Sequence, residues 1–327
     1  MKAFAYVNPA NEKDAVAALS AQPQQAMPIG GGQDLLARMK DYITQPDRLV
    51  NVKNALESTS KPMNGGLHIG AAMKMVDVAE NADIQRMYPA LAAAAIEVGT
   101  PQIRNQGTVG GNLNQRPRCW YFRNEEFNCL KKGGTTCFSI TGENQFHAIF
   151  GGGPSFIVHP SSLAVPMLAY RASFRIVGPK GERIVPASEY FTLPRVNVQK
   201  ENILEADELL THAILPAPGN VKSGHYEVRY KTSHDWPIAF ATVLLTMNGN
   251  TVRSARVVMG AVAPIPWRST AAEQALAGKP VNEQTAAAAA EAALKDARPF
   301  GQNAYKVQVA KTAVQRAILR AAGIAVA

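Results

Sequence analysis

Two glycine-rich stretches decide the fold of this chain: Pro28-Ile29-Gly30-Gly31-Gly32-Gln33-Asp34-Leu35-Leu36, the first glycine loop, and Thr108-Val109-Gly110-Gly111-Asn112, the second. Each lies at a strand-to-turn junction. Consecutive glycines let a backbone approach a ligand closely and point several N–H groups at one anion. Neither loop has the Gly-Lys-Ser/Thr ending of a Walker loop or the G-x-G-x-x-G spacing of a nicotinamide-binding turn. Together they predict a dinucleotide whose diphosphate lies between the two loops.

The sequence around the loops alternates strand-like and helix-like segments. Helix patterns at 75–87 and 88–99 separate the two loops. We expect residues 103–113, which contain the second glycine loop, to form a turn. Alternating patterns predict strands at 148–160 and a strand pair around a Pro-Lys-Gly turn at 173–184.

The stretch 216–224 has the composition of a linker and marks the predicted domain boundary. Beyond it, strand patterns flank a hairpin turn at Asn248-Gly249. Two helix patterns follow, at 282–297 and 305–322, and apolar residues at i, i+3 and i+4 in the last one predict a packing helix. Strands followed by helices are typical of an α+β lobe.

The composition describes a chain that can bury a sizeable core. Of its 327 residues, 46% are hydrophobic and 18% are charged. The net charge of +9 is spread along the chain without a basic block, so nucleic-acid binding is not expected. No apolar run reaches the roughly 18 residues of a membrane span, and the first residues lack the apolar core of a secretion signal. We therefore expect a soluble protein, with the cytoplasm as the default compartment.

All three cysteines lie in one stretch, RCWYFRNEEFNCLKKGGTTC, residues 118–137. Nine residues separate Cys119 from Cys129, and seven separate Cys129 from Cys137. Zinc sites use C-x2-4-C pairs, which are absent, whereas an iron–sulfur cluster is larger and accepts ligands from an irregular loop. The thiolate form is favoured by four basic neighbours: Arg118, Arg123, Lys131 and Lys132. The alternatives are small buried side chains, or one disulfide and a spare thiol, and a cubane would need a fourth ligand from elsewhere.

The chain resembles the FAD-binding medium subunit of the xanthine oxidase family of molybdenum hydroxylases. Besides the paired glycine loops, the resemblance rests on four segments: HAIFGGGPSFIVHPSSLA (147–164), ADELLTHAILPAP (206–218), HDWPIAFATVLL (234–245) and VVMGAVAPIPWR (257–268). It covers nearly the whole chain. The cysteine segment is similar to an inserted loop that binds a 4Fe-4S cluster in the subunits of bacterial aldehyde oxidoreductases and of 4-hydroxybenzoyl-CoA reductase.

The resemblance implies an α+β fold with two domains. Residues 1–218 would form a two-subdomain FAD-binding domain of the vanillyl-alcohol oxidase type, divided into 1–57 and 58–218. Residues 115–155, here called the cysteine loop, would form an iron–sulfur loop within it. Residues 219–327 would form a C-terminal flavoprotein domain.

Site residues follow from the resemblance by position. The FAD would be held by Ile29, Gly30, Gly31, Gly32, Gln33, Asp34 and Leu35 in the first glycine loop, and by Thr100, Gln102, Thr108, Gly110, Gly111 and Asn112 in and near the second. Leu209 or Leu210 would flank the flavin or the adenine. Lys231, or else Arg229, would approach the flavin from the C-terminal domain. Cys119, Cys129 and Cys137 would hold the cluster.

The chain departs from the family's pattern at three positions. Gln33 stands where Thr is usual, and Ser162 stands where an Asp normally contacts the cofactor. Ser155 occupies the place of a fourth cysteine, since the cluster-bearing relatives read GGGPC where this chain reads GGGPS. The fourth cluster ligand is therefore Ser155, His147 or none.

The resemblance implies an electron-transfer subunit with no catalytic residue of its own. A small subunit with 2Fe-2S clusters and a large subunit with a molybdenum cofactor would be its partners, and FAD would pass electrons to an external acceptor. The leading expectation is an aldehyde oxidase or dehydrogenase. The alternatives are a 4-hydroxybenzoyl-CoA reductase-like complex, a non-redox scaffold subunit and a stand-alone flavin oxidase. Relatives exported with a partner make the periplasm the alternative compartment.

Overall fold

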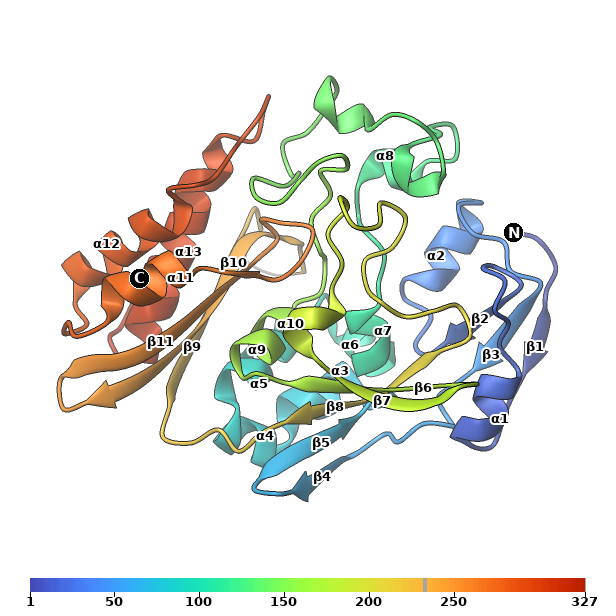
Figure 1. Ribbon diagram of the computed structural model, residues 1–327, viewed down its shortest axis with the longest axis horizontal. Helices are drawn as coiled ribbons and strands as arrows, with labels where there is room; N and C mark the ends of the chain where they lie inside the picture. The colour runs from blue at the N-terminus through green and yellow to red at the C-terminus, as the bar shows by residue number, and fades with distance from the viewer. Residues whose placement is uncertain (232–233, 327) are drawn as a thin grey trace.

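Three β-sheets organise the chain in a computed structural model that describes residues 1–231 and 234–326. The N-terminal sheet is parallel, and the central and C-terminal sheets are antiparallel, so the predicted α+β class is confirmed (Figure 1). In the N-terminal sheet the strand order is β1 (Ala5–Val7), β3 (Arg48–Asn51) and β2 (Ala26–Ile29). In the central sheet it is β4 (Ser60–Met63), β5 (Gly66–Gly70), β8 (Leu209–Leu215), β6 (Ser173–Gly178) and β7 (Gly181–Pro186). In the C-terminal sheet it is β12 (Trp267–Arg268), β11 (Thr251–Gly260), β10 (Pro237–Asn248) and β9 (Lys222–Arg229).

The helices are mostly short. They are α1 (Glu12–Ala17), α2 (Leu35–Lys40), α3 (Met75–Glu80), α4 (Ala82–Met87), α5 (Pro89–Ile96), α6 (Pro101–Gln106), α7 (Val109–Leu113), α8 (Trp120–Arg123), α9 (Ala164–Ala169), α10 (Ala187–Tyr190), α11 (Thr270–Leu276), α12 (Glu283–Leu294) and α13 (Tyr305–Ala321), with 3-10 turns η1 (Leu130–Lys132) and η2 (Phe138–Ile140). Among the residues described, no helix is long and apolar enough to cross a membrane.

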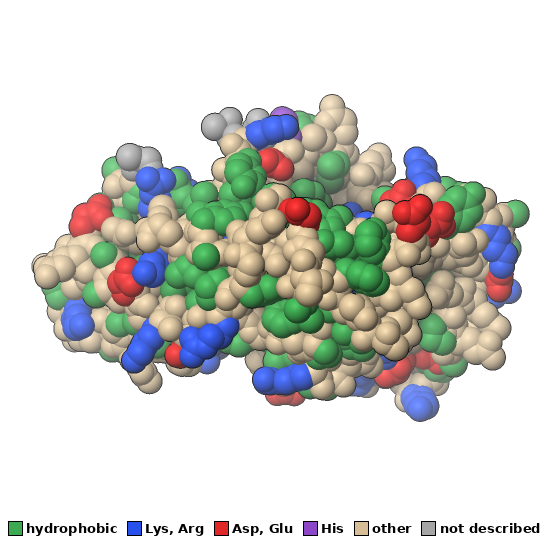
Figure 2. Space-filling view, turned by 90° about the horizontal axis from the view of Figure 1, so that it is seen from above, with side chains coloured by type: hydrophobic (Ala, Val, Ile, Leu, Met, Phe, Trp, Pro, Cys, Tyr) green, Lys and Arg blue, Asp and Glu red, His purple; other side chains and the backbone are tan. Residues whose placement is uncertain are grey.

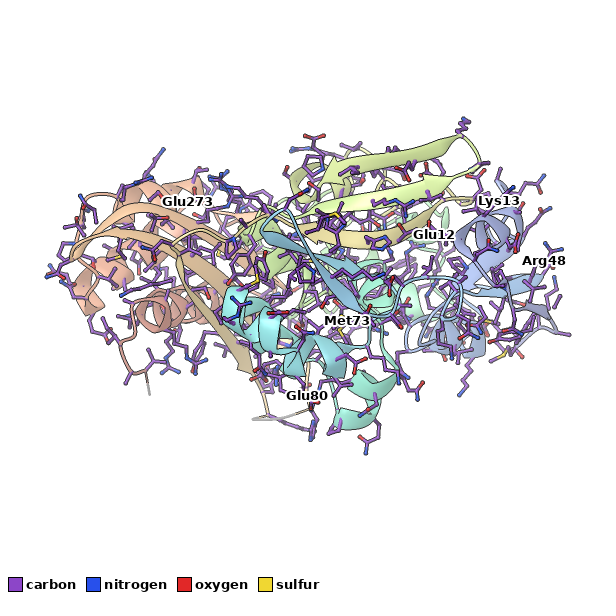
Figure 3. The ribbon with its side chains drawn as sticks, turned by 90° about the horizontal axis from the view of Figure 1, so that it is seen from below. Glu12, Lys13, Arg48, Met73, Glu80 and Glu273 are labelled. Carbon is purple, nitrogen blue, oxygen red and sulfur yellow. The ribbon has the colours of Figure 1, made fainter. Side chains whose placement is uncertain are left out.

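The N-terminal sheet has a small core of its own, made by Ile29, Leu35, Met39 and Leu49. An ion pair joins this unit to the central sheet: Arg175 of β6 donates to both carboxylate oxygens of Glu12 in α1, at 2.9 Å. Glu12 lies at that junction in Figure 3. The first glycine loop connects β2 to α2, so this unit places the loop beside the central sheet.

The main core lies between the central sheet and helices α3, α5 and α9. Leu67 and Ile69 of β5 and Met75 of α3 are fully buried in it. Tyr88 packs its ring edge against Tyr170 at 5.1 Å between centroids and donates to the carbonyl of Pro216 at 2.7 Å. This core fixes the segment from α3 to α7, which carries the second glycine loop.

The C-terminal lobe, at the left of Figure 1, packs α13 on β9 and β10 and α11 on β11, and α12 packs against these two helices. In α13 the buried positions Ala310, Ala313, Val314 and Ala317 recur at helical spacing, which confirms the predicted packing helix. The predicted hairpin is also confirmed, because Asn248 pairs with Thr251 and Gly249 adopts a positive φ of 55°. Figure 2 shows one face on which Lys and Arg side chains are dispersed among acidic and apolar ones.

The prediction of strands at 148–160 is wrong. Positive φ values at Gly151 and Gly153 interrupt the extended run, and the segment pairs with a neighbouring turn instead of a strand. The amide groups of Ile149 and Phe150 both donate to the carbonyl of Val262. The alternation of apolar residues therefore reflects burial between the two lobes rather than a sheet.

Two helix boundaries also differ from the prediction. Residues 103–113 belong to α6 and α7 rather than to a turn, because Thr100 and Thr108 cap these helices through their hydroxyls. The pattern at 75–87 forms two helices, α3 and α4, since Asn81 ends the first and caps the second by accepting from the amide of Ile84. At α6 and α7 the capping threonines favour helix despite the glycines of this stretch. Between α3 and α4 the capping asparagine starts a new helix although the apolar pattern continues.

The first glycine loop lies against the end of α6 and the first residue of the second glycine loop. A Cβ at Gly31 would overlap the carbonyl oxygen of Gln106 at the end of α6, and a Cβ at Gly30 would lie 2.7 Å from the Thr108 hydroxyl. On the other side of the second loop, a Cβ at Gly110 would lie 3.1 Å from the side chain of Ala71. The loops can approach this closely only because these positions lack side chains.

We predict that Gly31→Ala destabilises the chain by about 2–4 kcal/mol, because a backbone carbonyl cannot move aside as a flexible side chain can. Thermal unfolding of the purified protein measures the change. Gly107→Ala is the matched control. Its Cβ would lie 3.1 Å from the Ile103 carbonyl oxygen, which a shift of a few tenths of an ångström relieves, whereas a Cβ at Gly31 would lie 1.9 Å from the Gln106 carbonyl oxygen, and the φ of Gly107 is not positive. The control should change stability by no more than about 1 kcal/mol. Equal effects of the two substitutions would contradict the backbone contact.

Candidate functional site

A cavity of about 830 Å³ runs between the two glycine loops. Its volume lies within the roughly 300–1,000 Å³ typical of ligand pockets. The structure brings most of the predicted site residues to this cavity, which is lined by Ile29, Gly30, Gly31, Gly32, Gln33, Asp34, Leu35, Thr100, Thr108, Gly110, Gly111, Asn112 and Leu209. The cavity also extends along the cysteine loop, where Arg116, Arg118 and Lys131 line it.

The first glycine loop offers a row of free backbone donors. The amide groups from Gly30 to Leu35 donate no hydrogen bond to any acceptor in the described part of the chain. The amide of Leu36, by contrast, donates to the carbonyl of Gly32 at 3.0 Å and begins the helical bonding of α2. Consecutive unbonded amides in a partly buried loop form a concave site for an anion.

The amides of the second glycine loop already have acceptors within the chain, and the loop forms a wall of the cavity. The amide of Gly110 donates to the carbonyl of Ala71 at 2.8 Å, and the amide of Gly111 donates to the Thr108 hydroxyl at 3.2 Å. The Asn112 side-chain oxygen accepts from the Ser161 hydroxyl at 2.6 Å. This loop therefore contributes shape and close approach more than free amides.

Two predicted contacts lie elsewhere. The side chains of Gln102 and Lys231 are exposed, and neither residue lines the cavity. Arg229, the alternative to Lys231, is bound to the carboxylates of Glu227 and Glu97 at 2.5 and 2.8 Å. The C-terminal lobe borders the cavity a few residues later, through Trp236, and a flavin contact by Lys231 or Arg229 stays a prediction.

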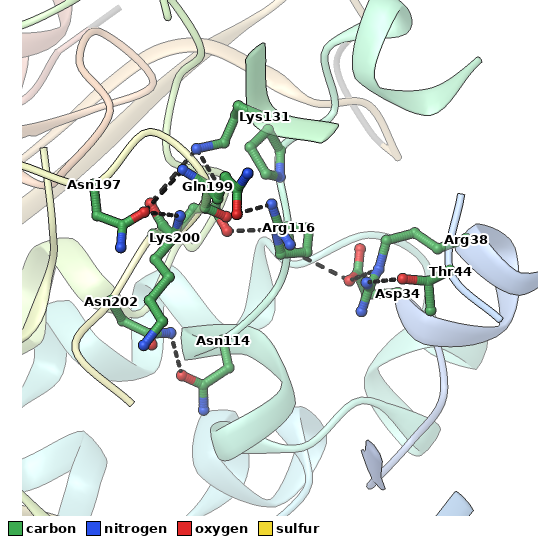
Figure 4. A network of polar contacts seen from close by, with 12 residues as sticks. Asp34, Arg38, Thr44, Asn114, Arg116, Lys131, Asn197, Gln199, Lys200 and Asn202 are labelled. Atoms are coloured by element: carbon green, nitrogen blue, oxygen red, sulfur yellow. Dashed lines mark hydrogen bonds and ion pairs between the residues drawn. The ribbon is translucent and has the colours of Figure 1, made fainter. Parts of the chain in front are cut away.

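Asp34 joins the first glycine loop to the cysteine loop. Its carboxylate binds Arg38 of α2 at 3.0 Å, Arg123 of α8 at 2.5 Å and Arg118 at 3.3 Å, and it accepts from the amide of Arg116 at 3.2 Å. Figure 4 shows the contacts of Asp34 with Arg38 and Arg116. Asp34 stands at the N-terminus of α2, but its side chain makes no helix-capping bond and serves this ionic contact instead.

The surroundings of Asp34 decide its charge. Burial alone would raise the pKa of this carboxyl, but the positive charges of Arg38, Arg123 and Arg118 outweigh burial and hold the pKa below its usual value. The side chain is 13% exposed. Asp34 is therefore ionised at neutral pH, and the cluster around it carries more positive than negative charge.

A second buried carboxylate anchors the other side of the cysteine loop. Glu201 binds Lys131 at 2.6 Å and Arg116 at 2.5 Å. Lys131 also donates to the carbonyl of Val198 at 2.8 Å. Figure 4 shows Lys131 and Arg116 converging on the 197–202 segment. Most of the basic side chains near the cysteines are thus occupied by carboxylates.

The three cysteines converge on one small cavity, although nine and seven residues separate them in sequence. It is lined by Cys119, Cys129, Cys137, His147 and Ser155, together with apolar and aromatic side chains. The cavity measures about 10 Å³, and no group of three His, Cys, Asp or Glu among the described residues could hold a single metal ion. The cysteines form no disulfide with one another. A cluster bound here would have to move these donors apart.

The expected effect of the basic neighbours on the thiols is wrong for Cys119. Burial raises the pKa of this thiol to about 11, so desolvation outweighs the nearby positive charge. Arg118 and Arg123 are bound to Asp34, and Lys131 is bound to Glu201. Cys119 is therefore a neutral thiol unless a metal replaces its proton.

The family is shown by two matches that together span most of the chain. Residues 2–218 match the family described as "FAD binding domain in molybdopterin dehydrogenase". This chain belongs to that family. Residues 224–321 match "CO dehydrogenase flavoprotein C-terminal domain". The family match confirms the resemblance inferred from the two glycine loops.

Known relatives match along their whole length. The aldehyde oxidoreductase FAD-binding subunit PaoB of Escherichia coli K12 is 33% identical over 318 residues, covering 95% of this chain and 96% of PaoB. The carbon monoxide dehydrogenase medium chain of Hydrogenophaga pseudoflava is 28% identical and covers 96% of both chains. In solved structures, that dehydrogenase, lacking the Mo-pyranopterin moiety, aligns with a TM-score of 0.77 at 27% identity over 98% of each chain. Quinoline 2-oxidoreductase of Pseudomonas putida 86 aligns with a TM-score of 0.77 at 25% identity over 98% of each chain.

Several residues that border the cavity had no recognisable signal in the sequence. Arg118 lies over the Trp236 ring at 4.8 Å and links the cysteine loop to the C-terminal lobe at the cavity. Glu201 lies in an irregular segment with no motif of its own.

We predict that Asp34→Asn lowers stability by about 3 kcal/mol, because it leaves buried guanidinium groups without their carboxylate. A fall of about 5 °C in the thermal midpoint should accompany this change. Asp83→Asn is the matched control, since Asp83 binds Arg86 at 2.6 Å but is 45% exposed. That control should cost no more than about 0.5 kcal/mol, and an Asp34→Asn protein as stable as the control would refute the buried junction.

The same carboxylate predicts a pH dependence. Because the folded pKa of Asp34 is lowered, its stabilising effect is complete above the ordinary aspartate pKa of about 4 and is lost as the pH falls through the lowered value. The stability difference between the wild type and Asp34→Asn should therefore be constant from pH 8 to pH 6 and shrink in acid. Thermal midpoints of both proteins, measured from pH 8 down into the acid range below pH 4, give this stability difference. A difference that grows in acid would have the wrong sign.

Proposed function

We propose that this chain is the FAD-binding electron-transfer subunit of a heterotrimeric molybdenum-containing aldehyde oxidase or dehydrogenase. A small subunit with 2Fe-2S clusters passes electrons to the FAD held by this chain, and the FAD passes them to an external acceptor. The substrate is oxidised at a molybdenum cofactor in a large subunit. The observation that carries the proposal is the row of unbonded amides in the first glycine loop, in a cavity that the second loop also lines.

The residues at the cavity fit the diphosphate of FAD. Six consecutive amides, from Gly30 to Leu35, are available as donors to phosphate oxygens. The charge of Asp34 does not repel the phosphates, because three arginines surround it and leave a positive excess at this end of the cavity. The second glycine loop closes the other side at backbone distance.

Apolar side chains fit the aromatic parts of FAD. Leu209 and Leu210, which are 3% and 4% exposed, line the cavity and provide a flat wall for the flavin or the adenine. Trp236 borders the cavity from the C-terminal lobe. The flavin supplies a group that accepts electrons and passes them on, and the protein binds and orients that group. The residues named here exclude water from one face of it.

Two observations choose among the candidate functions. The relative PaoB, whose name gives an aldehyde oxidoreductase, covers almost the whole chain and favours aldehydes over an aromatic CoA thioester. The unbonded amides oppose a scaffold that has lost its cofactor, because partly buried donors without partners are destabilising. The cavity therefore favours a cofactor-binding subunit over a scaffold that has lost its cofactor.

We further propose that the cysteine loop holds a 4Fe-4S cluster. Support comes from the convergence of Cys119, Cys129 and Cys137 on one cavity in an irregular loop, with Ser155 and His147 beside them. Thiolates are the ligands that such clusters use.

The test of the flavin is made on the complex purified with its partner subunits. We expect one FAD for each copy of this chain, released on boiling, and bleaching of the yellow flavin band when an aldehyde is added without oxygen. Bleaching by an aromatic CoA thioester system but never by aldehydes would move the assignment to the reductase alternative. A colourless complex that releases no FAD would remove the proposal altogether.

The test of the cluster is iron and acid-labile sulfide in complexes purified without oxygen. We expect the wild type to contain iron beyond that of the partner's clusters, and Cys129→Ser to lose that excess while keeping its FAD. Ser223→Ala, a change in β9 away from the cysteine loop, is the control and should keep both. Equal iron in all three complexes would contradict a cluster in this chain.

A further inference from the structure

Arg118 lies where three parts of the molecule meet. It belongs to the cysteine loop and lines the large cavity between the glycine loops. Its guanidinium group is 3.3 Å from the carboxylate of Asp34 in the first glycine loop. The same group lies over the ring of Trp236 from the C-terminal lobe, 4.8 Å from the ring centroid. The cysteine loop therefore brings a positive charge to the loop whose amides are unbonded.

The carboxylate of Asp34 is already neutralised without Arg118. Arg38 donates to one of its oxygens at 3.0 Å, and Arg123 donates to the other at 2.5 Å. Two guanidinium groups exceed the single negative charge of this carboxylate, so Arg118 is a surplus cation. A surplus charge in a partly buried place is costly unless an anion accompanies it.

The side chain of Arg118 has few partners of its own. In the described part of the chain its one hydrogen bond runs from Nη2 to the side-chain oxygen of Gln115, at 3.1 Å. Its Nε is buried and has no hydrogen-bond partner there, although the side chain as a whole is 28% exposed. Burial lowers the pKa of the guanidinium to about 10, which leaves it charged at neutral pH. Arg118 thus keeps both a charge and a donor available for a ligand.

The other basic side chains at this end of the cavity are better paired. Arg116 and Lys131 both bind the carboxylate of Glu201, at 2.5 and 2.6 Å. Of the carboxylates that line the cavity, only that of Asp34 forms an ion pair with Arg118 among the described residues. Arg118 is therefore the cation at the cavity with the weakest hold on the protein itself.

We propose that the guanidinium group of Arg118 binds the diphosphate of FAD, so that the cysteine loop supplies a residue of the flavin site. The inference rests on the proposed function and adds a binding residue to it, and it does not depend on a metal in the cysteine loop. Backbone amides bind phosphate oxygens without cancelling their charge, whereas a guanidinium group supplies both a full charge and paired donors. The ring of Trp236 positions this group, which makes the C-terminal lobe part of the same contact.

The test uses the whole complex, freed of FAD and then titrated. Arg118→Gln removes the charge and keeps a polar side chain, and Arg118→Lys keeps the charge. Arg256→Gln is the matched control, because Arg256 of β11 is also partly buried with an unpartnered Nε among the described residues, but it does not line the cavity. The affinities for FAD, ADP and riboflavin are measured, together with the thermal midpoint with and without FAD.

We expect Arg118→Gln to weaken the binding of FAD about 10-fold, a modest loss for a charge-assisted bond because the side chain is partly exposed. ADP should lose the same factor, since it carries the diphosphate, and riboflavin should be unaffected, since it carries none. Arg118→Lys should lose about 3-fold, and Arg256→Gln should bind FAD as the wild type does. Without FAD, the thermal midpoint of Arg118→Gln should stay within about 2 °C of the wild type, because the surplus cation stabilises nothing until its anion is bound.

Unchanged affinity for FAD in Arg118→Gln would overturn the assignment. A loss for riboflavin but not for ADP would also overturn it, because the contact would then be to the flavin ring. An equal fall of the thermal midpoint with and without FAD would make Arg118 a structural residue only. A wild-type complex that binds no FAD would instead remove the proposed function, and the ligand of Arg118 with it.

Discussion

The backbone contact between Gly31 and the carbonyl end of α6 is the constraint on which the rest of the structure depends. A side chain at Gly31 would occupy the place of the Gln106 carbonyl oxygen, so the two glycine loops meet at a distance that only glycine permits. The N-terminal sheet presents one loop and the central core presents the other. The cavity lies where these two units meet, and both glycine loops line it.

Charge then ties the cysteine loop to this junction. Asp34 lies in the first glycine loop, and its partners Arg118 and Arg123 flank Cys119 on either side. The cysteine loop and the first glycine loop are therefore joined by one buried carboxylate. On the far side, Glu201 holds Lys131, two residues after Cys129. The irregular loop is positioned by ion pairs rather than by a sheet or a long helix, which leaves its backbone free to follow the shape of a bound group.

Sequence patterns predicted the elements whose causes are local. The apolar spacing of α13, the Asn248-Gly249 hairpin and the two glycine loops were all readable, because periodicity, a positive φ and the absence of a Cβ leave signs in the chain itself. The strands expected at 148–160 were wrong, since apolar alternation cannot distinguish a sheet from a segment buried between two lobes. The partners of Asp34 and the raised pKa of Cys119 were not foreseen, because long-range pairing and desolvation depend on which segments meet in space.

The central claim is that the two glycine loops hold the diphosphate of one FAD between them. A cryo-electron microscopy map of the complete complex, at a resolution that places the cofactor, tests it most directly. The account predicts phosphate density within hydrogen-bond distance of the amides from Gly30 to Leu35, with the second glycine loop against its other side. Density for FAD at another place in the chain, with these amides facing only water, would contradict it.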